Sequence, residues 1–169
     1  MLLSITDGVA VDMKAFNPQT HYVLAHGDVT AVQSTLKLLH NESKLFEVVT
    51  LLVPGYNDGQ QEIKDICGFV REELSSTVPL HFSRFFPKHK MSDLPPTSSA
   101  VIQEAIDIAR HSGIEHVYAS NIDMPHNDTY CHECGRSLVT LQGIRNPVLH
   151  IVDGKCPYCG NSMPGIWDL

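Results

Sequence analysis

Apolar residues in the first 125 positions alternate between two patterns. Short runs rich in β-branched residues at 8–15, 46–53, 78–82 and 116–120 predict strands, and the second run is nearly uncharged, as in a strand covered on both faces. Between them, apolar positions spaced by three or four predict helices over 29–41, about 60–74, and a segment that ends before Gly113. This order predicts an α/β fold with parallel strands joined by right-handed crossovers. Four strands are too few for an eight-stranded barrel, so we expect a small open layer or part of a larger barrel.

Two details refine the second predicted helix. Asn57 followed three residues later by Gln60 resembles a capping box, which places the helix start near these residues. Cys67 lies on the apolar stripe of the same helix, so we predict a buried core cysteine rather than a reactive thiol.

Composition changes near Pro125. Residues 1–125 are predicted to form the α/β domain, and residues 126–169, rich in His, Cys, Gly, Asn and Pro, a small second module. The formal net charge of −7 argues against a nucleic-acid partner or an anionic membrane surface, which need a basic face. No apolar stretch approaches the roughly 20 residues of a membrane span and no secretory signal is evident, so we predict a cytoplasmic protein.

The second module contains two matched cysteine pairs. Cys131 and Cys134 are followed by Gly135, and Cys156 and Cys159 are followed by Gly160. Two intervening residues let both thiolates of a pair reach one metal ion, and two such knuckles supply a tetrahedral four-sulfur shell. Strand-like segments at 137–141 and 148–152 predict a hairpin between the knuckles.

We therefore predict a zinc-ribbon-like module with structural zinc at these four cysteines. A single iron in the same four-sulfur shell is the alternative metal, because the sequence does not separate the two. His126, His132 and His150 are further potential ligands. With four cysteines present, we expect them to lie at the surface or outside the metal shell.

Charged residues gather where the predicted strands end. Asp12 and Lys14 are two positions apart and therefore project to the same side, which suits a zwitterionic or charged ligand, or else a plain ion pair. Past the third strand a basic cluster suits an anionic group, or else consists of solvated loop charges. The cluster comprises Arg84, Lys88, His89 and Lys90.

Several segments together resemble a known family. Residues 11–16, 50–58, 79–87, 129–131 and 164–167 are similar, in order and spacing, to the C-terminal half of AmmeMemoRadiSam-system radical SAM proteins, which are relatives of the pyruvate formate-lyase activating enzymes. The resemblance implies a partial, half (β/α) barrel with parallel strands that binds S-adenosylmethionine and a 4Fe–4S cluster.

The resemblance also assigns cofactor-binding residues. Asp12 and Lys14 match an Asp-x-Lys motif near the amino-acid portion of S-adenosylmethionine. By position, Thr50 and Leu51 match the following strand, which lines the pocket. His81 or Arg84 would lie near the adenine.

The largest departure of the sequence from this family is an absence. The sequence has no Cys-x-x-x-Cys-x-x-Cys loop to hold the cluster, so we expect the chain to be inactive alone. It would be a fragment, one part of a split enzyme completed by an N-terminal half-barrel chain, or a decayed half. The alternative function is a non-enzymatic zinc-ribbon binding module on an α/β scaffold. Neither reading identifies a substrate.

Overall fold

The computed structural model describes residues 5–124, 127–141 and 147–167. The chain divides into two compact units, Met1–Met124 and Pro125–Leu169. Within the described residues, no helix has the length and apolar character needed to cross a membrane.

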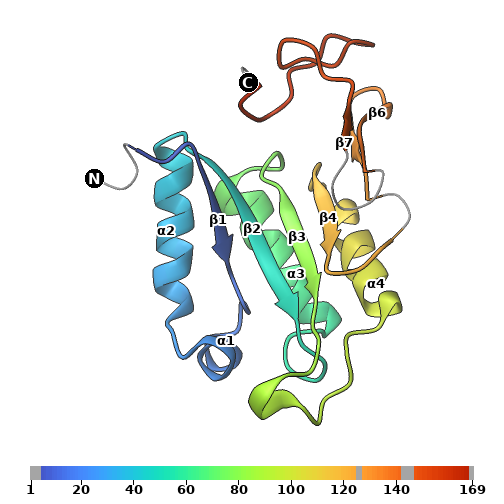
Figure 1. Ribbon diagram of the computed structural model, residues 1–169. Coiled ribbons are helices and arrows are strands. Elements are labelled where there is room, and N and C mark those ends of the chain that lie inside the picture. Colours follow the sequence, from blue (N-terminus) through green and yellow to red (C-terminus); the bar gives the residue numbers. More distant parts are fainter. Residues whose placement is uncertain (1–4, 125–126, 142–146, 168–169) are drawn as a thin grey trace. The chain divides into compact units, whose positions relative to one another are not determined.

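The first unit is built on a four-stranded parallel sheet. Its strands are β1 (Gly8–Asp12), β2 (Leu45–Leu52), β3 (Leu80–Arg84) and β4 (Val117–Ser120), and they lie side by side in the order of the sequence (Figure 1). Every pairing between neighbours is parallel. The structure therefore confirms the predicted α/β class and the parallel strands.

The helices form the connections between the strands. They are α1 (Pro18–Ala25), α2 (Val29–Asn41), α3 (Gln60–Phe69) and α4 (Ser99–His111), with a π-helical turn at Val70–Leu74 and a 3-10 turn at His89–Met91. The predicted helices correspond to α2, to α3 with its π-helical continuation, and to α4. Helix α1 was not predicted, because His21 is its one buried residue and it has no apolar stripe. Its start signal was present, since Asn17 caps the helix and Pro18 occupies the first turn.

The core of this unit lies on one face of the sheet. Helices α2, α3 and α4 pack there, and the buried residues of β2 are every second one, Phe46, Val48, Thr50 and Leu52 (Figure 1). The alternate residues Glu47, Val49 and Leu51 are half-buried on the opposite face. The expectation that β2 is covered on both faces is wrong for this unit, because no helix of the described chain packs on that side. We call this side the open face of the sheet.

The second unit is a three-stranded antiparallel sheet with a very small core. Its strands are β5 (Thr129–Tyr130), β6 (Ser137–Leu141) and β7 (Pro147–Leu149), in that spatial order. The predicted hairpin corresponds to β6 and β7, but β7 ends at Leu149, and Val152 instead pairs with Lys155 across a tight turn. The buried hydrophobic residues are Cys131, Leu138, Cys156 and Met163, with Ile151 and Trp167 packed against them.

Candidate functional site

The two cysteine pairs form knuckles with the same backbone pattern. In the first, the amide of Gly135 donates to the carbonyl of Cys131 at 2.8 Å, and in the second, that of Gly160 donates to the carbonyl of Cys156 at 2.9 Å. Both glycines have positive φ, 69° and 77°, which a residue with a side chain rarely adopts. The glycine after each second cysteine is thus required by the turn that aims both sulfurs of a pair in one direction.

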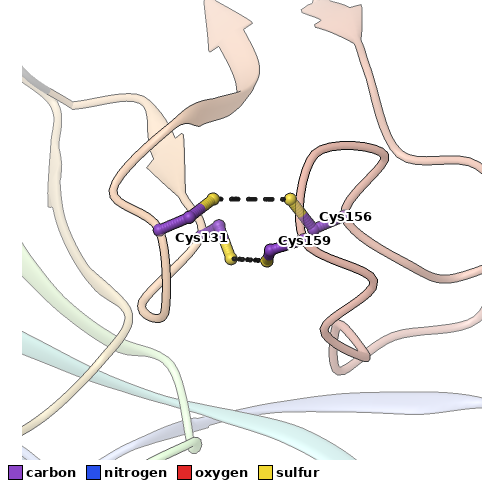
Figure 2. A group of neighbouring side chains, drawn as sticks. Cys131, Cys156 and Cys159 are labelled. Atoms are coloured by element: carbon purple, nitrogen blue, oxygen red, sulfur yellow. Dashed lines mark hydrogen bonds between the residues drawn. The ribbon is translucent and has the colours of Figure 1, made fainter.

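The four sulfur atoms converge on one point. All lie within 4.8 Å of one another, with Cys131 Sγ 3.5 Å from Cys159 Sγ and Cys134 Sγ 3.7 Å from Cys156 Sγ. Figure 2 shows the sulfur of Cys131 facing that of Cys159 on the other knuckle, next to Cys156. A disulfide requires about 2.05 Å between sulfurs. A zinc–sulfur bond of about 2.3 Å gives a tetrahedral edge of about 3.8 Å, so the spacing fits a metal ion coordinated by four thiolates.

The protonation of the cluster is uneven. Burial raises the pKa of the Cys156 thiol. Hydrogen bonds from the backbone amides of Tyr158 and Cys159 and from the neighbouring thiols lower it by more, so the net pKa is about 7. For Cys159 the amide of Asn161 lowers the pKa, whereas burial and the surrounding thiols raise it, to about 12. A metal ion coordinated by four thiolates has to displace the protons of the free cysteines, so its binding depends on pH.

The candidate histidine ligands are not needed to complete this shell. His132 lies 3.6 Å from the Glu133 carboxylate, and His150 is exposed. His126 lies outside the described residues. Cys67 is completely buried in the helical core of the first unit, and burial raises its pKa to about 12. The prediction of a core cysteine is confirmed.

The Asp12 and Lys14 side chains lie together at the carboxyl end of β1. Lys14 Nζ is 2.5 Å from Asp12 Oδ1, and the side chains are 28% and 57% exposed for Lys14 and Asp12 respectively. Met13, between them, is completely buried in the core. Both charged side chains therefore project from the open face, and they form an ion pair available to a ligand.

The other predicted cofactor-binding residues divide between the two faces of the sheet. Leu51 and His81 alternate with the buried positions of their strands and share the open face with Asp12. The hydroxyl of Thr50 is buried on the helical side and donates to the carbonyl of Met13 at 2.9 Å. Arg84 Nε donates to the carbonyl of Thr97 at 2.8 Å, and its guanidinium stacks on Phe86. The structure thus brings Asp12, Lys14, Leu51 and His81 to one face and engages Thr50 and Arg84 elsewhere.

The residues of the predicted basic cluster are not all alike, because Arg84 is bonded to the Thr97 carbonyl whereas the other three are exposed. Lys88, His89 and Lys90 are exposed around the 3-10 turn. They remain a predicted anion site.

The sequence did not predict that His81 pairs with Glu47 on the open face. His81 Nε2 lies 3.0 Å from Glu47 Oε2, and the His81 ring lies over Tyr118 with 5.0 Å between ring centroids. His81 and Tyr118 are register partners, and Asp12 belongs to the same cross-strand row through Val49. The period-two pattern places Glu47 on the face of Val49, but the pairing with His81 requires the register between β2 and β3.

The expected capping box is also corrected. Gly59 is the N-cap residue of α3, and Gly59 forms no side-chain capping bond. Asn57 is completely buried and its side chain points back to the sheet, where it bonds to the backbone of β2 and of the segment after β1. The spacing of the capping motif is present, but the buried Asn57 amide bonds to backbone groups of the sheet and does not cap the helix.

Comparisons with known proteins place the fold. No protein-family model matches the chain. An uncharacterized protein of Methanocaldococcus jannaschii is 32% identical over 160 residues, covering 93% of this chain and 48% of its own length. A domain of pyruvate-formate lyase-activating enzyme from Bacteroides vulgatus superposes with a TM-score of 0.61 at 14% identity, covering 71% of each chain. The chain has a radical-SAM-like fold.

A second solved structure agrees with this assignment. A radical SAM methyltransferase from Sphaerobacter thermophilus gives a TM-score of 0.50 at 18% identity, covering 67% of this chain and 34% of the methyltransferase. The chain spans about half the length of the Methanocaldococcus relative it matches. At these identities the two solved structures show the fold alone.

The cysteines of this chain do not fit a 4Fe–4S cluster. A cluster that activates S-adenosylmethionine needs three nearby thiolates and an iron left open. Four of the five cysteines converge on a single-metal shell, and Cys67 is sealed in the core with a raised pKa. Cluster ligands would have to come from outside this sequence.

Proposed function

We propose that this chain is the C-terminal part of a radical SAM barrel of the AmmeMemoRadiSam class, and that its open face lines the S-adenosylmethionine site. The observation that carries the proposal is the one-sided sheet. Helices cover one face, while the other presents Asp12 and Lys14 at the carboxyl end of β1, the end of parallel strands at which α/β proteins bind ligands. His81 lies on the same face, in the cross-strand row of Asp12.

Each predicted residue has a role in this proposal. The Asp12 carboxylate and the Lys14 ammonium would pair with the ammonium and carboxylate of the amino-acid portion. Leu51 and His81 would form the wall beside the adenosyl portion. Thr50 and Arg84 would act indirectly, because their polar groups already hold the Met13 and Thr97 carbonyls.

The 4Fe–4S cluster would be held by an N-terminal half-barrel that carries the cysteine triplet, on the same or a second polypeptide. When bound, the cluster supplies the electron that cleaves S-adenosylmethionine. β1 is an edge of the four-stranded sheet, so a parallel strand of that half can pair with its free backbone groups. The four cysteines of the second unit would hold structural zinc, since a shell of four thiolates leaves no open position for chemistry.

The decisive experiment is reconstitution. The chain is co-expressed with an N-terminal half-barrel carrying the triplet, and 5′-deoxyadenosine is measured under anaerobic, reducing conditions. We expect product from the assembled complex, and a large loss with Asp12→Asn. An Asp93→Asn variant, which changes an exposed loop carboxylate elsewhere, serves as the matched control. Absence of product from a complex shown to be assembled and cluster-loaded would refute the proposal.

A second candidate function is a non-enzymatic zinc-ribbon binding module. It is favoured by large apolar residues exposed on the second unit, Leu149, Val152, Tyr158 and Ile166. This function requires that the assembled protein have no affinity for S-adenosylmethionine, which isothermal titration calorimetry measures directly.

A further inference from the structure

We propose that Asn57 is a positioning residue that clasps the carboxyl ends of β1 and β2 and fixes the backbone bearing Asp12 and Lys14. The inference rests on the proposed function, since it concerns the site at which those two side chains would meet S-adenosylmethionine. It assigns a role to the turn after β2, which touches neither charged side chain directly.

The Asn57 side chain makes three bonds to two separate segments. Its Nδ2 donates to the carbonyl of Lys14 at 2.5 Å and to that of Leu51 at 2.8 Å, and its Oδ1 accepts from the amide of Val53 at 2.6 Å. The residue is completely buried. Both amide hydrogens and the amide oxygen are used, so no side chain of similar size other than an amide satisfies all three backbone groups.

The turn that presents Asn57 is closed by its own bonds. The amide of Gly55 donates to Asp58 Oδ1 at 2.9 Å, and Gly55 has a φ of 78° that favours glycine. The amide of Tyr56 donates to the carbonyl of Val53 at 3.1 Å. The turn is therefore stabilised independently of β1, and Asn57 is held ready to receive the Lys14 carbonyl.

Side chains outside the turn also hold the same segment, among them His21, whose Nδ1 lies 3.3 Å from the amide nitrogen of Ala15. Thr50 Oγ1 donates to the carbonyl of Met13, one residue before Lys14. The Glu62 carboxylate accepts from the backbone amides of Phe16 and Asn17, the latter at 3.1 Å. Glu62 belongs to the first turn of α3, and Asn57 lies in the turn just before that helix. The short stretch from Met13 to Asn17 is thus attached to β2 and α3.

These attachments explain how a two-residue spacing becomes a ligand site. The buried Met13 side chain and the bonded carbonyls on both sides of Lys14 leave the backbone little freedom to rotate. Asp12 and Lys14 then project together before any ligand arrives, which reduces the ordering that binding must supply. A loosened clasp would lower affinity without removing any group that touches the ligand.

The test uses three variants of the full chain. Asn57→Asp keeps the size of the side chain but cannot donate to the Lys14 and Leu51 carbonyls. Glu62→Ala releases the Phe16 and Asn17 amides from a more exposed position, and so remains informative if Asn57→Asp fails to fold. Gln60→Ala is the matched control, because Gln60 is exposed and bonds Glu104 instead.

Two readouts separate the clasp from the proposed function. Amide hydrogen exchange on the chain alone should accelerate at residues 13–17 by on the order of tenfold or more in Asn57→Asp and Glu62→Ala, as expected when buried bonds are lost, and not in Gln60→Ala. In the assembled complex, the dissociation constant for S-adenosylmethionine should rise on the order of tenfold for both variants, and for Asp12→Asn without faster exchange.

The possible outcomes are distinct. Unchanged exchange at residues 13–17 in both folded variants overturns the clasp. Faster exchange with S-adenosylmethionine affinity unchanged in these variants, while Asp12→Asn weakens binding, also overturns the positioning role and leaves the proposed function standing. If Asp12→Asn itself leaves binding unchanged, the proposed function fails at this site whatever the exchange shows.

Discussion

The second unit should depend on its metal for its fold. Outside the ligands, its buried hydrophobic residues among those described are Leu138 and Met163. Burying two such side chains contributes roughly 3–6 kcal/mol. Structural zinc in small four-ligand sites contributes on the order of 10–16 kcal/mol. The metal term is the larger, so removing the ion should unfold the second unit and leave the first unit, with its own extensive core, folded.

The perturbation is Cys134→Ser, with Cys67→Ala as the matched cysteine control in the other unit. The assay combines metal analysis with tryptophan emission, because the single tryptophan, Trp167, packs on the second unit's core and its Nε1 donates to the carbonyl of Met163 at 3.1 Å. We expect about one zinc per chain in the unmodified protein and in Cys67→Ala. For Cys134→Ser we expect much less zinc, red-shifted Trp167 emission, and loss of dispersed amide resonances from the second unit only.

Two results would refute this reasoning. Unchanged Trp167 emission and amide dispersion after complete metal removal would show that the apolar core suffices. One iron per chain in place of zinc would keep the four-sulfur site but refute the assignment of the metal.

Further predictions follow from individual contacts. Burial lowers the pKa of His81 below its usual value, and the Glu47 carboxylate partly offsets this. Between the lowered pKa and the usual value of about 6.5, the unfolded chain therefore binds more protons than the folded chain. The free energy of unfolding should fall as pH falls through that window. Glu47→Gln should lower the His81 pKa further, measured by NMR titration of the ring, whereas a rise would contradict the assignment. Cys67 should resist thiol reagents until the chain unfolds, because burial raises its pKa to about 12; rapid labelling of the native chain would show an opening of the core. Gly165→Ala should weaken metal retention in a competition with a chelator, since a Cβ there would lie 2.8 Å from the Trp167 ring, and unaltered retention would show that the ring moves aside.

The elements of the first unit were predictable because its periodicity is strong. The stripe through Ile102, Ala105, Ile106 and Ala109 is buried as the spacing requires. Helix α1 was not predicted, because a helix that buries only His21 shows no apolar periodicity. Asn17 and Pro18 nevertheless marked its start. The convergence of the four cysteines was predictable, since their spacing is local chemistry that needs no register.

Contacts across the sheet were not predictable in the same way. The pairing of Glu47 with His81 depends on how far β3 is shifted along β2, which neither strand's sequence states. Asn57 was assigned to the wrong partner for a related reason. Its spacing to Gln60 satisfies a helix-start pattern, but the carbonyls of Lys14 and Leu51 become its partners only after β1 and β2 pair. A buried amide is drawn to whichever unsatisfied backbone groups the assembled sheet leaves beside it.

The two units differ in how far the side chains of their candidate sites are already bonded within the protein. In the second unit the four cysteine sulfurs converge on one point, and a metal ion held by all four would have no position open for a substrate. On the open face of the first unit the charged groups are held from behind, by bonds to their backbone, while their side chains stay half-exposed. A group that is fixed but incompletely satisfied gains most from a ligand of complementary charge. We therefore expect a ligand to add the most free energy at the open face, and a metal ion at the four-cysteine site to stabilise the second unit.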